Sequence, residues 1–270
     1  MGLIFDINSA KLFHSWYRSS QGKAMDASIN KSILTLLKPQ RGERILDIGC
    51  GEGNHLLFLN SLGLDISGID ASPYMISRAR ERLGNRCTLK IGMAEDLPFD
   101  DNEFDLAVFI NTLEFLDDPL KALKEAGRVA KRKVFVGVMN SLSWNCLYRK
   151  SMGLFRESIF RYVKFYNILE LKSYVQKAYG NVPMTWRCKP GRSSLVGKKD
   201  RPMTDRWDIK HCPFGSFLGL SATILYRVRT DQHPLKVRLK KAEHSVVRGA
   251  TMKNTNRVTG GHRRERSLSL

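Results

Sequence analysis

Residues 45–53 read ILDIGCGEG, a short apolar run that passes directly into three alternating glycines. The apolar run predicts a buried strand, and the glycines let the backbone turn sharply and let a ligand lie against bare main chain. A helix starting near Asn54 would present its first amide groups to that ligand. The spacing differs from the G-x-G-x-x-G dinucleotide fingerprint, because Asn54 stands where the third glycine would be. A ligand-binding turn and a simple tight turn both fit this stretch alone.

Strands and helices are expected to alternate on both sides of this turn. Apolar runs predict strands, and amphipathic stretches between them predict helices of about ten residues, which is typical of βαβ units and a parallel sheet. We therefore expect an α/β fold, Rossmann-like and doubly wound, with a mostly parallel sheet. The expected strands are 43–49, 64–70, 88–92, 104–111 and 133–139, and the expected helices are 54–63, 72–84 and 117–130.

The alternation stops after Asn140. Residues 141–180 are helical in tendency and rich in aromatics, and residues 181–216 contain several Gly and Pro and are expected to be loop-like. Residues 221–230 alternate apolar and polar and predict a final antiparallel strand. We thus expect a helical, aromatic insertion over 141–216 after the fifth strand. Its rings either cover the sheet as core or roof a ligand cleft.

The net charge of +19 is unevenly distributed along the 270 residues. Residues 1–140 hold 18 basic and 18 acidic side chains, whereas residues 141–232 carry +11 and residues 233–270 carry +8. An anionic surface, either membrane or nucleic acid, and plain solvation both fit a basic C-terminal half. The expected division is a domain over 1–232, with its ligand-binding core at about 40–140, and a basic, flexible tail over 233–270.

Asp70 ends the second expected strand, and Gly51 lies 19 residues before it. An acidic side chain at this place can accept hydrogen bonds from both hydroxyls of a ribose, and it can also cap the helix that follows. Together with the glycine turn, Asp70 predicts a nucleoside cleft at the carboxyl ends of the first two strands.

Two further stretches follow in order: AEDLPF at 94–99, after the third expected strand, and FD at 104–105, which opens the fourth. In these features, with LDIGCGEG at 46–53 and the acidic residue ending strand two, the sequence resembles the class I S-adenosylmethionine-dependent methyltransferases of the type 11 group. The resemblance covers about residues 40–140 and extends more weakly over 5–30. It implies S-adenosyl-L-methionine as the cofactor.

The resemblance also implies roles for particular residues in holding the parts of that cofactor. Many relatives have Asp at the position of Met93, where it contacts the adenine amino group. Met93 can only pack against the ring, so this contact would pass to Glu95 or to main chain. The implied cofactor-binding residues are Asp47, Gly49 and Gly51 at the methionine, Asp70 at the ribose, Ala71, Met75, Met93, Ala94 and Glu95 around the adenine, and Asn111 near the methionine and the reacting methyl.

No catalytic constellation or metal site is expected. A sulfonium methyl is already activated, so alignment can supply much of the catalysis without an acid or base. The five cysteines include no C-x-x-C pair, which argues against a zinc site. His14 and His55 show no carboxylate partner in the sequence pattern and are expected to be structural or surface residues. The segment around Tyr17 resembles one that folds over the cofactor in relatives, and a helix packed on the core fits it equally.

Three functions remain open from the sequence. The first is a methyltransferase, placed in the cytoplasm, that acts on a small-molecule or lipid-like acceptor. The second is an RNA methyltransferase, favoured by the basic charge and the aromatic residues. The third is a non-catalytic module that binds the cofactor. The acceptor atom, the oligomeric state and the use of a general base cannot be read from these motifs.

Overall fold

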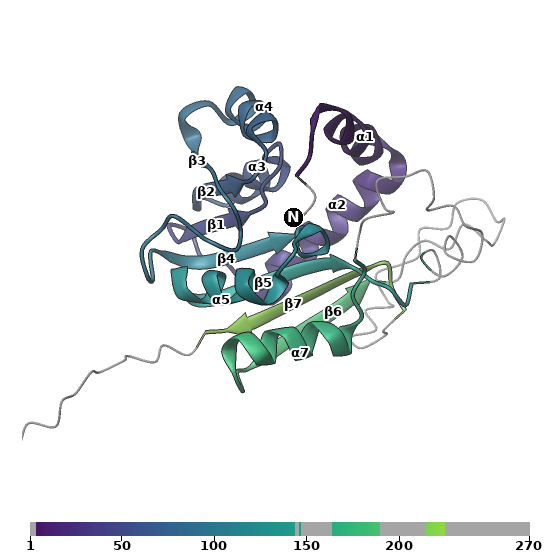
Figure 1. Ribbon diagram of the computed structural model, residues 1–270, viewed down its shortest axis with the longest axis vertical. Coiled ribbons are helices and arrows are strands. Elements are labelled where there is room, and N and C mark those ends of the chain that lie inside the picture. Colours follow the sequence, from purple (N-terminus) through teal and green to yellow (C-terminus); the bar gives the residue numbers. More distant parts are fainter. Residues whose placement is uncertain (1–3, 144–145, 147–163, 190–213, 225–270) are drawn as a thin grey trace, which may run out of the picture. The chain divides into compact units, whose positions relative to one another are not determined.

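The computed structural model describes residues 4–143, 146, 164–189 and 214–224 (Figure 1). Within this part of the chain, seven strands form one sheet in the order β3-β2-β1-β4-β5-β7-β6. The strands β1 to β5 pair in parallel, and β7 runs antiparallel to both of its neighbours. The strand bounds are β1 Arg44–Ile48, β2 Asp65–Asp70, β3 Thr88–Ile91, β4 Phe104–Ile110, β5 Ala130–Met139, β6 Met184–Lys189 and β7 Phe217–Thr223.

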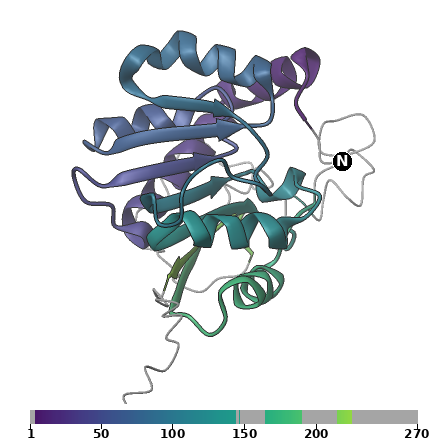
Figure 2. The ribbon, with the colours of Figure 1, turned by 60° about the vertical axis from the view of Figure 1, so that its left-hand side comes forward.

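Helices cover both faces of the sheet (Figures 1 and 2). Buried side chains of α5 and α7 form one core layer, and those of α2, α3 and α4 form the other. The sheet is therefore doubly wound and mostly parallel, which confirms the expected fold class. The helix bounds are α1 Ile7–Arg18, α2 Ser20–Ser32, α3 Asn54–Ser61, α4 Pro73–Leu83, α5 Pro119–Val129 and α7 Ile168–Tyr179, with short helical turns at Ile33–Leu37, Gly84–Arg86 and Leu113–Phe115.

Capping side chains start the helices where the sequence indicates. Ser72 Oγ accepts a hydrogen bond from the amide of Met75 at 3.3 Å, and Pro73 occupies the first helical position of α4. Asp118 Oδ1 accepts a hydrogen bond from the amide of Lys121 at 3.0 Å at the start of α5. These caps fix where α4 and α5 begin, and hence where the loops before them lie.

Strand order reverses beside β1, which pairs with β2 on one side and with β4 on the other. In open α/β sheets, ligands bind beyond the carboxyl ends of the strands at such a switch point. The glycine turn leaves β1 at this end, Asp70 is the last residue of β2, and Asn111 directly follows β4. The fold thus brings three of the predicted cofactor-binding segments to one edge of the sheet.

The C-terminal half differs from the expectation in two places. Residues 181–216 were expected to be loop-like, but Met184–Lys189 forms the strand β6 on the edge of the sheet. Met184, Trp186 and Cys188 pack against the core while Thr185 is exposed, so the strand has the period-two pattern of a half-buried edge.

The last strand also begins earlier than 221–230, at Phe217. Its side chains from Phe217 to Ala222 are all buried, because neighbours cover both faces, and such a strand reads as a continuous apolar run rather than an alternation. Residues 225–270, with the expected tail, and residues 147–163 lie outside the described part.

Candidate functional site

A cleft lies at the carboxyl ends of β1, β2 and β4 and combines apolar walls with a few polar groups. The N-terminal segment, the glycine turn, the end of β2 and the loops after β3 and β4 all contribute to it. Its lining comprises Ile4, Phe5, Tyr17, Ile48, Gly49, Cys50, Gly51, Glu52, Asn54, His55, Ile69, Asp70, Ala71, Met75, Gly92, Met93, Ala94, Glu95, Ile110, Asn111, Thr112, Phe115 and Leu116. Of the ten residues predicted to bind the cofactor, all except Asp47 line this cleft.

The glycine turn holds two residues that glycine alone suits, for different reasons. Gly49 has φ of +76°, and a Cβ there would lie 2.2 Å from Cγ2 of Thr112. Gly51 has φ of +52°, and a Cβ there would meet nothing within 4 Å. Packing against the end of β4 therefore requires Gly49, whereas Gly51 leaves open space on the side of the cleft. That space is the kind of cradle that a ligand fills.

Asp70 is held by the turn that it faces. Its Oδ2 accepts a hydrogen bond from the amide of Gly51, and its Oδ1 accepts one from the amide of Ser72, each at 2.9 Å. Burial raises the pKa of the Asp70 carboxyl, and the two amide donors oppose that shift. Each carboxylate oxygen retains a lone pair for a further donor, which fits a pair of ribose hydroxyls.

Asp47 lies beneath the turn and does not line the cleft. Its side chain is 1% exposed, and neither carboxylate oxygen makes a hydrogen bond with the described residues. Burial, with a smaller contribution from the charge of Asp70, raises the pKa of Asp47 to about 8. Its predicted contact with the methionine part of a cofactor stays a prediction.

Asn111 directly follows β4 and carries an unpaired polar atom into the cleft. Its backbone has φ of +52°, and its amide donates to the carbonyl of Gly137 at 2.8 Å, which fixes the turn. The side-chain Oδ1 is buried and makes no hydrogen bond with any described residue. Because a buried polar atom without a partner is costly, Asn111 is suited to receive a donor from a ligand.

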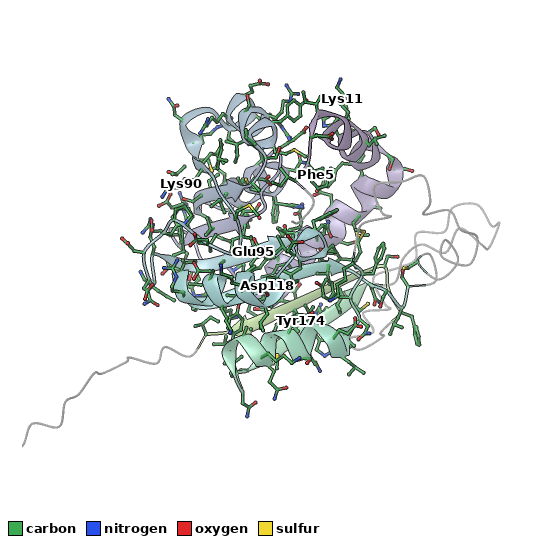
Figure 3. The ribbon with its side chains drawn as sticks, in the orientation of Figure 1. Phe5, Lys11, Lys90, Glu95, Asp118 and Tyr174 are labelled. Atoms are coloured by element: carbon green, nitrogen blue, oxygen red, sulfur yellow. The ribbon has the colours of Figure 1, made fainter. Side chains whose placement is uncertain are left out.

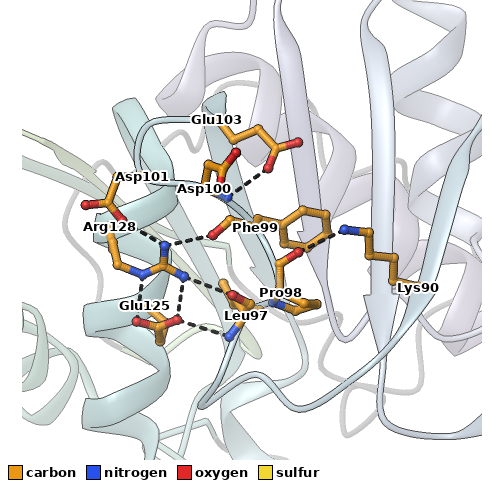
Figure 4. A network of polar contacts seen from close by, with 9 residues as sticks. All are labelled: Lys90, Leu97, Pro98, Phe99, Asp100, Asp101, Glu103, Glu125 and Arg128. Carbon is orange, nitrogen blue, oxygen red and sulfur yellow. Dashed lines mark hydrogen bonds and ion pairs between the residues drawn. The ribbon is translucent and has the colours of Figure 1, made fainter.

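The loop after β3 carries Met93, Ala94 and Glu95 and is tied to α5 (Figures 3 and 4). Arg128 donates to the carbonyls of Leu97 and Phe99 at 2.9 and 2.8 Å, and Glu125 accepts from the amide of Leu97 at 3.0 Å.

A hydrogen bond from Arg128 lowers the pKa of Glu125, so the pair stays charged at neutral pH. This network fixes the base of the loop. Oε2 of Glu95 is buried and makes no hydrogen bond with any described residue, so it is available to a ligand.

The N-terminal segment lines part of the cleft through Ile4, Phe5 and Tyr17, and its folding over the cofactor stays a prediction. Ser72 Oγ donates to the carbonyl of Phe5 at 2.6 Å. The ring of Phe5 packs edge-on against Phe115, with centroids 5.1 Å apart. Sequence reasoning missed Phe5, Phe115 and Leu116 as lining residues, although an apolar residue close behind a β4 turn is a signal that could have indicated them.

Both histidines near the turn have carboxylate neighbours, contrary to the expectation. His14 Nδ1 lies 2.9 Å from Oε2 of Glu52, and His55 Nδ1 lies 3.6 Å from Oδ1 of Asp26. The sequence could not show these pairs, because 38 positions separate His14 from Glu52, and His55 and Asp26 lie on different helices. Of the two histidines, only His55 lines the cleft.

The expected insertion over 141–216 contributes nothing to the lining from its described residues, 141–143, 146, 164–189 and 214–216. Tyr166 is fully buried, with its hydroxyl donating to the carbonyl of Leu113 at 3.3 Å, so this ring belongs to the core. A role for the rest of 141–216 in roofing the cleft stays a prediction.

Three observations fit these residues to a nucleoside-containing cofactor. Asp70 offers two carboxylate oxygens to paired hydroxyls, Gly51 leaves an open cradle, and Asn111 and Glu95 present buried oxygens that lack donors. All of them belong to one cleft.

Within the described residues, no helix is long and apolar enough to cross a membrane.

Part of the chain matches a known family of proteins. The family described as "Methyltransferase domain" matches residues 46–136. Demethylmenaquinone methyltransferase of Staphylococcus carnosus is 32% identical over 37% of this chain and 44% of its own length. Tocopherol O-methyltransferase of Arabidopsis thaliana is 28% identical over 46% of this chain and 37% of its own length. The chain thus spans less than half the length of these curated relatives.

Among solved structures, a possible histamine N-methyltransferase from Thermotoga maritima has the same fold, with a TM-score of 0.59 and 23% identity. The match covers 78% of this chain and 93% of that one. The family match includes the end of β1, the glycine turn, Asp70 and all of β4. Residues 46–136 thus match the methyltransferase domain family, and the chain shares its fold with this solved structure.

Proposed function

We propose that this protein transfers a methyl group from S-adenosylmethionine to a small-molecule or lipid-like acceptor. The observation that carries the proposal is the convergence of Asp70, Gly51 and Asn111 in one cleft inside the segment that matches the family. A non-catalytic module is less well supported, because the cleft combines a carboxylate suited to ribose hydroxyls with unpaired polar groups beside it.

When bound, S-adenosylmethionine supplies a methyl group that its sulfonium already activates. Asp70 would hold the ribose hydroxyls, and the loop at 93–95 would edge the adenine. Asn111 would fix the chain that leads to the reacting centre. The apolar side chains of Phe5 and Phe115 would exclude water from the same region, so that the acceptor replaces water as the nucleophile.

Two observations support a small or lipid-like acceptor. The lining near the end of β4 is apolar, with Ile110, Phe115 and Leu116 beside Ile4 and Phe5. Relatives named for demethylmenaquinone and tocopherol act, by those names, on lipid-like molecules. The charge of +11 over 141–232 supports an acceptor that is held at an anionic surface. That the protein acts in the cytoplasm stays a prediction.

The test begins with calorimetric binding of S-adenosylmethionine to the full chain. Transfer of a radiolabelled methyl group is then measured with a quinol, a chromanol, a sterol and total RNA as acceptors. The proposal expects cofactor binding and transfer to at least one lipid-like acceptor. Transfer to RNA alone would show that the acceptor is a nucleic acid and not a lipid-like molecule. A protein that does not bind the cofactor would contradict the proposed function altogether.

A further inference from the structure

A cluster of three side chains joins three helices where the cleft passes the start of α3. Tyr17 of α1 donates a short hydrogen bond through its hydroxyl to Oδ1 of Asp26, on α2. The same hydroxyl lies 3.1 Å from Nε2 of His55, in the first turn of α3. The rings of Tyr17 and His55 stand edge to face, and both side chains line the cleft. None of these three residues is among those predicted to bind the cofactor.

With His55 neutral, the cluster holds one N–H or O–H proton fewer than the number of contacts among its three side chains. Tyr17 gives its single hydroxyl proton to Asp26, so Nε2 of His55 must be the donor in the contact with Tyr17. Nδ1 of His55 is then an unprotonated nitrogen that faces Oδ1 of Asp26 at 3.6 Å. This Nδ1 is buried and makes no hydrogen bond with any described residue. A lone pair therefore faces a carboxylate at a distance where a protonated Nδ1 would form an ion pair with it.

Burial explains why this proton is absent from the free protein. Burial lowers the pKa of His55 well below its usual value, and the nearby charge of Asp26 opposes that shift without overcoming it. Two other acidic groups lie near the cluster, Asp47 below the turn and Glu52. Glu52 pairs with Arg82 at 3.7 Å and with His14 at 2.9 Å. The imidazole is therefore neutral at neutral pH.

Under the proposed function, the amino-acid end of the cofactor would be the part that reaches this cluster. With the ribose at Asp70 and the adenine at the loop of 93–95, the methionine chain must pass the glycine turn. His55 lies just beyond that turn, four residues after Gly51. The chain ends in the α-carboxylate, which is the only anionic group of S-adenosylmethionine. A second negative charge facing His55 would favour its protonated form.

We propose that the cofactor's α-carboxylate binds beside Tyr17 and His55 and that its binding drives the uptake of one proton at Nδ1 of His55, which then forms an ion pair with Asp26. This inference rests on the proposed function. Solvent supplies the proton, and the N–H bond is the only covalent bond formed. Asp47 responds in the opposite sense, because a cationic amino group and sulfonium favour its ionised form and hence proton release. The test must therefore separate the carboxylate from the cationic groups.

A pair of ligands makes this separation: S-adenosylmethionine and its decarboxylated analogue, which keeps the amino group and the sulfonium. Each is titrated into the full chain near pH 6 in two buffers that differ in ionisation enthalpy, which gives the number of protons taken up. S-adenosylmethionine should take up on the order of half a proton more than the analogue. Its affinity advantage over the analogue should also fall by about tenfold as the pH rises from 5 to 7.

Substitutions then assign the proton to its site. His55→Gln keeps an N–H donor toward Tyr17 but cannot titrate, so the difference in proton uptake between the two ligands should vanish. His14→Gln is the matched control, because His14 also pairs with a carboxylate but does not line the cleft, and it should keep the difference. Asp26→Asn should reduce the difference, and it serves as the second variant if His55→Gln fails to fold by circular dichroism.

The outcomes separate the two proposals. If both ligands bind with equal proton uptake, or if His14→Gln rather than His55→Gln removes the difference, proton-linked binding is wrong while the methyltransferase proposal stands. If neither ligand binds the unaltered protein, both proposals fail.

Discussion

The amide of Gly51 donates to Oδ2 of Asp70 at 2.9 Å, which joins the turn after β1 to the last residue of β2. The other carboxylate oxygen accepts from the amide of Ser72, which is also the cap of α4. One carboxylate thus organises the turn and the following helix and also faces the cleft. A single side chain therefore shapes the proposed cofactor site and would also hold the ribose under the proposed function.

Asp70→Ala should weaken the binding of S-adenosylmethionine by about ten- to a hundredfold, which corresponds to the loss of charge-assisted hydrogen bonds worth roughly 1.5–3 kcal/mol. Calorimetry measures the dissociation constant. Asp65→Ala is the control, because Asp65 begins the same strand, is exposed, and pairs only loosely with Arg44 at 3.7 Å. An unchanged dissociation constant for Asp70→Ala would show that another group holds the ribose.

Gly51→Val should abolish cofactor binding, because its side chain would occupy the open space at the turn. Gly84→Val provides a control, since Gly84 also has a positive φ, +56°, and open surroundings but does not line the cleft. Both variants should lose about 1–3 kcal/mol of stability from backbone strain. Equal cofactor affinity in the two variants would contradict the assignment of Gly51 to the site.

Arg128→Met should loosen the loop after β3, because it removes the donors to the carbonyls of Leu97 and Phe99. We expect a loss of about 1–2 kcal/mol, limited by the partial exposure of Arg128. Urea unfolding measures the loss, and faster amide hydrogen exchange over 93–99 locates it. Arg78→Met is the comparison, since the exposed pair of Arg78 and Glu81 should contribute less than about 0.5 kcal/mol.

Glu114→Gln should change how stability depends on pH. Burial raises the pKa of Glu114 from 4.5 to about 8, so the folded state binds a proton more tightly than the unfolded state does. Its contribution is therefore fully present below pH 4.5 and decreases as the pH rises toward 8, by at most about 1.4 kcal/mol per pH unit.

Unfolding midpoints measured between pH 5 and 8 should accordingly fall less steeply for Glu114→Gln than for the unaltered protein. Burial raises the pKa of Asp47 as well, so Asp47 should preserve part of the decrease in stability with rising pH in Glu114→Gln. The exposed Glu81 offers a control, because Glu81→Gln should leave the slope unchanged. A slope that also stays unchanged in Glu114→Gln would show that Glu114 is ionised in the folded protein.

The sequence predicted β1 to β5 and the helices between them because their signals are local. Apolar runs mark the strands, and Ser72, Pro73 and Gly84 punctuate α4. The strand β6 carried the alternating pattern of MTWRCK, but Gly and Pro on either side obscured it. Asp70 and the glycine turn were predictable because a recurring spacing relates them.

The neighbours of His55 were not predictable. Its contacts come from helices α1 and α2, and the packing of these helices against α3 fixes which side chains meet. No spacing rule relates residues that meet only through tertiary packing. The place of Phe5 in the lining of the cleft was hidden for the same reason, since it depends on a hydrogen bond to Ser72, 67 positions later.

The position of β7 has a consequence for the growing chain. β7 is the last described strand in sequence, yet it lies between β5 and β6. Until the ribosome has released Phe217 and the residues after it, β6 lacks its partner strand and the edge of β5 that pairs with β7 stays open. Every segment that lines the cleft has already emerged by then. An open strand edge invites pairing with other chains. The nascent protein thus passes through a stage in which the ligand site can assemble while the sheet remains prone to aggregate, and cofactor binding at that stage would stabilise the part already folded.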